Sequence, residues 1–142
     1  MPKKNQRKEF VEYIRDAVLE ILHVADLPHY SYDIVLEDHY MDNHTSDGGH
    51  NSINAEIHAL PEYQNFTLNV FKSMFDLYKE KNFQELSEIL CHEIGHLHTQ
   101  RLFSLSQEPF KTEQEITKAN EELTTKIGYY LFGRLNEYNH KK

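Results

Sequence analysis

The chain has 142 residues, of which 39% are hydrophobic and 27% charged, and its formal net charge is −8. This length and composition predict one globular domain, residues 1–142, and exclude both a disordered chain and one that needs disulfides to complete its core. The negative charge argues against binding to nucleic acids or anionic membranes. The basic residues 1–8 are the exception, and we interpret them as a flexible, solvated tail.

The first half of the chain predicts one helix and then three strands. Residues 8–24 carry apolar side chains at helical spacing, and this helix should end before Pro28. Apolar and polar residues then alternate at 30–37 (YSYDIVLE), 52–60 (SINAEIHAL) and 65–71 (NFTLNVF), a pattern typical of half-buried strands. We therefore expect a small three-stranded sheet, antiparallel or mixed, packed on the helix.

The segment between the first two strands is polar and contains a turn signal at residues 47–49, Asp-Gly-Gly. Several of its side chains are potential metal ligands, namely His39, His44, His50, Asp42 and Asp47. Their spacing matches no known metal cage. We therefore interpret the segment as a polar hairpin loop rather than as a second metal site.

The second half of the chain predicts three helices, at about 71–80, 83–102 and 112–138. The last begins at Thr112 and Glu115, which have the Thr-x-x-Glu form of a capping box. Together with the strands, these helices predict an α+β fold in a single domain.

The only cysteine, Cys91, cannot form an internal disulfide, and its position in the 83–102 helix predicts a packed side chain. The sequence contains neither a signal-peptide pattern nor an apolar run of membrane-spanning length. The expected location is therefore the cytoplasm.

The 83–102 helix contains the sequence ILCHEIGHLHT, in which His92, Glu93 and His96 form the pattern His-Glu-x-x-His. Histidines four residues apart lie one helical turn apart, so both imidazoles can reach one ion. Glu93 is rotated by about 100° from His92, outside the ligand set but within reach of a metal-activated water. Such a water loses its proton to a neighbouring carboxylate in catalytic zinc sites, so the pattern predicts Glu93 as a general base.

The alternative interpretation is a helix with two surface histidines. Gly95 modestly favours the metal site, because a glycine costs about 1 kcal/mol inside a helix unless something passes close by. His98 lies on a different side of the helix and is not counted as a ligand.

A third ligand is expected from the last helix, where Glu121 and Glu122 are the candidates. Glu122 projects with the charged residues of the solvated face. Glu121 shares its side with small and large apolar residues, as expected where two helices approach closely: Thr124, Gly128, Phe132 and Leu135. A carboxylate in such a seam needs a partner, which a metal ion would supply. We therefore prefer Glu121 as the third ligand. The remaining alternative is that Glu121 and Glu122 are both ordinary surface acids that bind no metal.

The pair HEIGH and NEELTT resembles the gluzincin motifs of thermolysin type, His-Glu-x-x-His and Asn-Glu-x-x-Ser/Thr-Asp. The extended metzincin pattern is absent, because Thr99 and Leu102 stand at its Gly and His positions. In layout, roughly residues 30–135 are similar to small phage and bacterial metallopeptidase-like proteins of the ImmA/IrrE type. The chain departs from the thermolysin pattern at Thr125, where an Asp would orient a ligand histidine.

The resemblance implies a zincin-like fold in which His92, His96 and Glu121 bind Zn²⁺ and Glu93 is the general base. The expected function is that of a zinc-dependent peptidase, with a protein or peptide as its substrate and no role for nucleic acid or membrane. One alternative is a regulatory or interaction module that keeps the metal site without hydrolysis, and a weaker one is hydrolysis of a non-peptide amide. Tyr129 or Tyr130 could steady an oxyanion, although packing is the favoured role for both.

Overall fold

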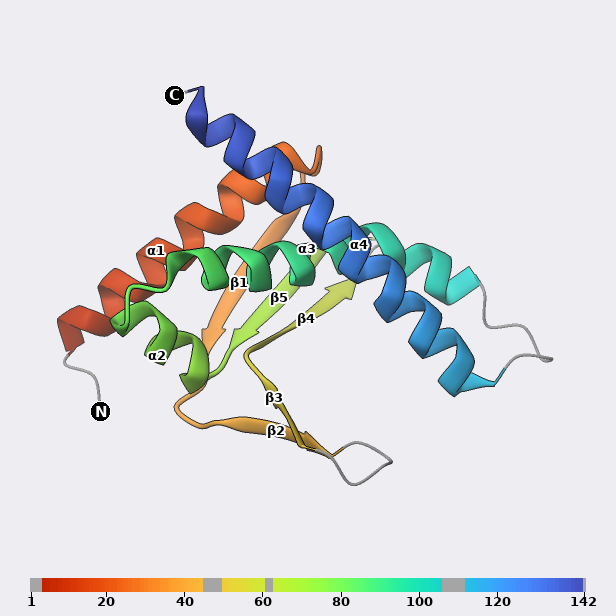
Figure 1. Ribbon diagram of the computed structural model, residues 1–142, viewed down its shortest axis with the longest axis horizontal. Helices are drawn as coiled ribbons and strands as arrows, with labels where there is room; N and C mark the ends of the chain where they lie inside the picture. Colours follow the sequence, from red (N-terminus) through yellow and green to blue (C-terminus); the bar gives the residue numbers. More distant parts are fainter. Residues whose placement is uncertain (1–3, 45–49, 61–62, 106–111, 142) are drawn as a thin grey trace.

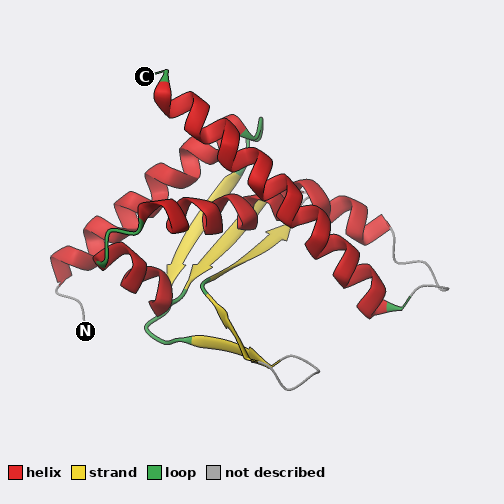
Figure 2. Cartoon of the chain, in the orientation of Figure 1, coloured by secondary structure: helices red, strands yellow, loops and turns green. Residues whose placement is uncertain are grey.

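The computed structural model describes residues 4–44, 50–60, 63–105 and 112–141 (Figure 1). The elements in chain order are α1 (Lys4–Val24), β1 (Ser31–Leu36), β2 (Met41–His44), β3 (His50–Ile53), β4 (Ala55–Leu60), β5 (Asn65–Val70), α2 (Lys72–Lys79), α3 (Phe83–Leu105) and α4 (Glu113–His140). Figure 2 shows that the chain is mostly helical, with one small sheet and a separate hairpin. The predicted α+β class is therefore confirmed.

The three-stranded sheet is mixed and has the order β1-β5-β4. The central strand β5 runs parallel to β1 and antiparallel to β4. Leu68 lies opposite both Ile34 and Ile57, so the apolar residues of all three strands share one face. That face belongs to the core, whereas Asp33 and His58 on the other face are exposed. The sheet therefore has one apolar side for the helices to cover.

The predicted strand at 52–60 is two strands, which corrects the sequence interpretation. Asn54 separates β3 from β4, and its carbonyl accepts a hydrogen bond of 3.0 Å from the backbone of Phe71. Upstream of this bond the chain leaves the sheet, and β3 pairs instead with β2 as an antiparallel hairpin. The hairpin extends away from the sheet in Figure 1.

The segment predicted as a loop between two strands thus forms a hairpin of its own, and β1 and β4 on either side of it are not paired with each other but with β5. Asp47 and its glycine turn lie outside the described residues, as do the side chains of His44 and His50. Within the described part of the chain, His39 and Asp42 belong to no group of metal-ligating side chains.

The structure also corrects the prediction that residues 1–8 form a flexible tail, because α1 already begins at Lys4. The residues at this end are good helix formers, and two of them have acidic partners. Arg7 lies 3.3 Å from the carboxylate of Asp38, and Lys8 lies 4.0 Å from Glu12 one turn along the helix. Residues 1–3 are outside the described range.

The core is formed where α1 and α3 meet the apolar face of the sheet. Phe10, Ile14 and Val18 line α1, and Leu90 and Ile94 line α3, all of them at most 1% exposed. Cys91 is also buried, as predicted, and its burial raises the pKa of the thiol to about 12. Among the described helices, none is long and apolar enough to cross a membrane.

Candidate metal centre

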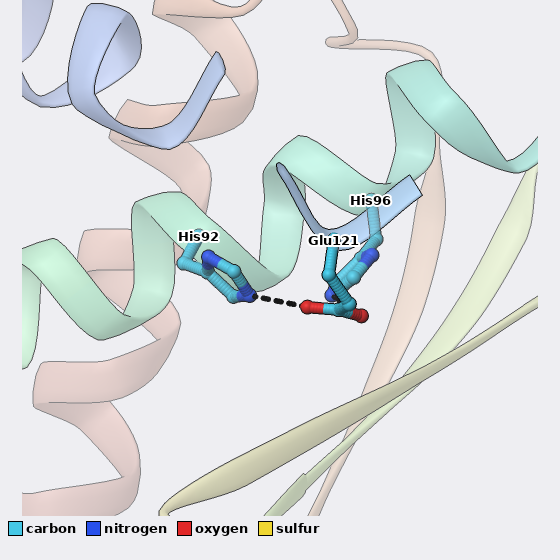
Figure 3. A group of neighbouring side chains, drawn as sticks. All are labelled: His92, His96 and Glu121. Atoms are coloured by element: carbon cyan, nitrogen blue, oxygen red, sulfur yellow. Dashed lines mark ion pairs between the residues drawn. The ribbon is translucent and has the colours of Figure 1, made fainter. Parts of the chain in front are cut away.

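Three side chains converge where α4 crosses α3 (Figure 3). His92 and His96 come from α3, one turn apart, and Glu121 comes from α4. The Nε2 atom of His92 lies 3.5 Å from one carboxylate oxygen of Glu121, and Nε2 of His96 lies 3.6 Å from the other. The structure thus brings together the three residues that the sequence interpretation selected as ligands.

The spacing of these atoms would allow the three residues to hold one metal ion. Zinc binds histidine nitrogen and carboxylate oxygen at about 2.0–2.2 Å, so neighbouring ligand atoms of a tetrahedron lie about 3.3–3.5 Å apart. The two His–Glu separations are close to this edge length, and the ligand atoms of all three residues lie within 4.8 Å of one another. Two imidazoles and one carboxylate are also the donor set of many catalytic zinc sites. Glu122 is exposed and does not join the group.

Two glycines allow α3 and α4 to approach this closely. A Cβ atom on Gly95 would lie 3.2 Å from the backbone oxygen of Thr124, and one on Gly128 would lie 3.0 Å from Cα of His92. Both distances are shorter than ordinary van der Waals contacts, and the atoms met are backbone atoms that cannot rotate away. The close approach expected from Gly95 and from the small-residue seam of α4 is therefore confirmed.

Replacing Gly128 with alanine is expected to lower the free energy of unfolding by about 1–3 kcal/mol, because α3 and α4 must separate to admit the methyl group. Gly133 provides a matched control on the same helix, since a Cβ there would meet nothing within 4 Å. Gly133→Ala should instead raise stability by up to about 1 kcal/mol through helix propensity. Urea denaturation of both variants tests the pair, and equal stabilisation by both would contradict the close packing.

Burial and charge act differently on the two histidines. The Glu121 carboxylate raises the pKa of His92, and His92 in turn lowers the pKa of Glu121. The pKa of His96 is lowered, mainly because its ring is buried. Without metal, His92 therefore holds a proton more tightly than an ordinary histidine, while His96 releases its proton more readily.

Zinc affinity is accordingly expected to fall as the pH is lowered, and to begin falling above 6.5, the ordinary histidine pKa. Glu121 keeps a proton on His92 to higher pH, and a bound metal ion must displace that proton. Competition with a chromophoric chelator at pH 6, 7 and 8 measures the effect. A site of carboxylates alone would keep its affinity over this range, so a constant affinity would exclude His92 as a ligand.

Glu93 follows His92 in the chain but lies outside the ligand group. Burial raises the pKa of its carboxyl to about 7, against the opposing effects of His92 and a hydrogen bond from the backbone N–H of Ile57. That hydrogen bond connects the carboxylate to β4. Glu93 is thus under the influence of His92 on one side and of the sheet on the other, and the pKa of its carboxyl lies near neutral pH.

The chain matches no protein-family model, no curated protein and no solved structure. The interpretation of the centre consequently depends on its own residues and geometry.

Two threonines near His96 were not anticipated as part of the site. Thr124 contacts the Nδ1 atom of His96 at 3.2 Å, and Thr99 contacts Thr124 at 2.9 Å. A signal was present in the sequence, because each threonine lies three residues after a candidate ligand, His96 or Glu121. Thr125, at the position of the Asp in the thermolysin pattern, lines a cavity beside His92 instead.

The remaining candidates fall on different sides of the helices. His98 points away from the centre, as predicted, and its ring is hydrogen-bonded to the backbone of Ala25. Tyr129 lines the same cavity as His92 and Glu93. Tyr130 lies on a separate surface, where its hydroxyl accepts a 3.2 Å hydrogen bond from Arg134. Of the two tyrosines, Tyr129 is therefore the one beside the candidate site.

Proposed function

We propose that this protein is a zinc-dependent peptidase in which His92, His96 and Glu121 hold the metal and Glu93 is the general base. The observation that carries the proposal is the convergence of two imidazoles and a carboxylate beside a second, partly buried carboxylate, that of Glu93, which is not in the ligand group. Two ordinary surface histidines would need neither an acid from another helix nor a partly buried acid beside them.

A zinc ion in such a site supplies Lewis acidity and lowers the pKa of water to about 7. The protein's part is to accept, hold and deliver the proton. In the metal-free protein burial raises the pKa of Glu93 to about 7, which makes its carboxylate more basic than that of an ordinary glutamate. Such a carboxylate could take a proton from the attacking water and give it to the departing amine. The hydrogen bond from Ile57 keeps the carboxylate in place between these two transfers.

A cavity of about 430 Å³ adjoins His92 and Glu93 and is the proposed position of a substrate side chain. Its walls include Ile89 and Phe132 as well as two acids, Glu85 and Glu88. The acids are hydrogen-bonded to neutral amides, at 2.8 Å from Asn82 and 3.1 Å from Gln84. No lysine or arginine is among the described residues that line the cavity. The cavity therefore favours a long side chain with a positive charge, lysine or arginine.

Strand β4 is proposed to hold the substrate backbone. It forms one edge of the three-stranded sheet, and its first residue, Ala55, lines the cavity together with Ile53 and Asn54, which precede it. An extended peptide can add to such an edge through main-chain hydrogen bonds. The N–H of Ile57 is already used by Glu93, so substrate pairing on β4 would lie directly beside the general base.

The test is incubation of purified, zinc-loaded protein with a peptide library, followed by mass spectrometry of new amino termini. Cleavage that is abolished by a chelator and concentrated near lysine or arginine supports the proposal. Zinc binding without any new termini would favour the non-hydrolytic module instead. Cleavage next to acidic residues would contradict the role given to Glu85 and Glu88.

A further inference from the structure

Two buried hydroxyl groups lie behind His96, on the side of the ring opposite Glu121. Thr99 on α3 is 1% exposed and Thr124 on α4 is 0% exposed, and no other polar side chain of the described core is buried to this degree. Three contacts connect them to His96. The Thr99 hydroxyl donates to the His96 backbone oxygen at 3.2 Å, the two hydroxyls are 2.9 Å apart, and Thr124 Oγ1 is 3.2 Å from His96 Nδ1.

The number of available protons determines the direction of each hydrogen bond. Each hydroxyl carries a single proton. The three contacts can all be hydrogen bonds at once only if Thr99 gives its proton to the backbone oxygen of His96 and Thr124 gives its proton to Thr99. Thr124 then has no proton left for the imidazole, and the third contact requires that Nδ1 of His96 be the donor. Because the hydroxyls are buried, water cannot replace any of these bonds without opening the interface between α3 and α4.

A proton on Nδ1 of the neutral ring leaves Nε2 with a free lone pair. Nε2 is the atom that faces Glu121, at 3.6 Å. In the other tautomer Nε2 would carry the proton, which would block the ligand atom. We propose that Thr99 and Thr124 are positioning residues that hold His96 in its Nδ1–H tautomer, so that Nε2 is presented to a divalent cation. The inference about the tautomer concerns the metal-free protein, and only its benefit for metal binding depends on the proposed function.

The two threonines also link the ligands of different helices. Thr124 lies one turn after Glu121 on α4, and Thr99 lies one turn after His96 on α3. The bond between the hydroxyls therefore fixes the ring of His96 relative to the helix that carries Glu121. Mutating a partner that orients a ligand histidine in this way typically weakens metal binding by about 10–100-fold.

The decisive variant is Thr99→Val, because Thr99 does not touch the imidazole ring. In this variant the Thr124 hydroxyl no longer has the Thr99 hydroxyl as an acceptor. It is then expected to donate its proton to Nδ1 of His96, which favours the Nε2–H tautomer. Thr124→Val removes the contact to the ring directly and should have the same effect. Thr99→Ser and Thr124→Ser keep the hydroxyls and serve as matched controls.

Two measurements decide the inference. The ¹⁵N chemical shifts of the His96 ring in the metal-free protein report the tautomer, and competition titration reports zinc affinity. We expect the Nδ1–H form in the wild type and both serine variants, with zinc affinity about 10–100-fold weaker in the valine variants. Urea denaturation identifies a variant that has failed to fold.

The inference would be overturned by an Nε2–H tautomer in the wild type. It would also be overturned by folded valine variants that keep the Nδ1–H form and bind zinc as the wild type does. A wild type that shows the Nδ1–H form but binds no zinc would support the hydrogen-bond assignment and refute the proposed function, so the two failures are distinguishable.

Discussion

Replacing Glu93 with glutamine is expected to lower peptide hydrolysis by at least about 100-fold, the usual contribution of a general base. Glutamine keeps the shape of the side chain and can still accept the hydrogen bond from Ile57, but it cannot take a proton from water. Because Glu93 lies outside the ligand group, the variant should bind zinc with unchanged stoichiometry. The measurements are the rate of cleavage and the zinc content by elemental analysis.

Glu122→Gln is the matched control, since it removes one carboxylate from the exposed face of α4 and should leave both quantities unchanged. Loss of activity together with loss of zinc would mean that Glu93 supports the metal site rather than the proton transfer. Equal cleavage by wild type and Glu93→Gln would refute the peptidase mechanism and favour the interaction module.

The helices and the convergence of His92, His96 and Glu121 could be predicted from local sequence patterns because helical periodicity fixes which side chains share a face. His92 and His96 are four residues apart, and the small residues after Glu121 marked the face of α4 that meets α3. Each helix could therefore be oriented before its neighbour was known. The capping box at Thr112 is also present in the structure, and α4 begins there as predicted.

The arrangement of the strands could not be predicted in the same way. Alternation shows which side chains of a strand face the core, but it does not identify the neighbouring strand. The parallel pairing of β1 with β5 depends on a connection of nearly thirty residues, and the sequence gives no local indication of it. The short strands β2 and β3 have the polar sequences MDNH and HNSI, which contain no apolar alternation.

Two contacts around the candidate ligands were missed for a related reason, because each joins residues that are distant in the chain. Ile57 meets Glu93 only because β4 passes beside α3, and Thr99 meets Thr124 only because α3 and α4 cross. Threonine also has a low preference for helix interiors, so its presence one turn after each ligand had no evident local benefit. The benefit lies in the hydrogen bonds between the two helices.

Removing the carboxylate of Glu121 is expected to weaken zinc binding by more than about 100-fold. The loss of a residue that merely orients a ligand already weakens metal affinity by about 10–100-fold, and a ligand should contribute more. Two histidines would remain, and two ligands do not complete a protein zinc site. Glu121→Ala should leave the unfolding free energy of the metal-free protein within about 0.5 kcal/mol of wild type, because the side chain is half exposed. Competition titration and urea denaturation measure the two quantities separately.

Glu122→Ala is the matched control, because it removes the same group from the neighbouring position of the same helix. It separates the loss of a specific ligand from a general loss of negative charge on α4. Helical rotation turns Glu122 by about 100° away from Glu121, and the structure leaves it exposed and outside the ligand group. Of these two acids, Glu121 is the one with carboxylate oxygens 3.5 and 3.6 Å from the two imidazoles. Zinc should therefore be retained in Glu122→Ala and lost in Glu121→Ala. Equal loss from both would show that binding depends on the charge of α4 as a whole, and the three-residue centre would have to be abandoned.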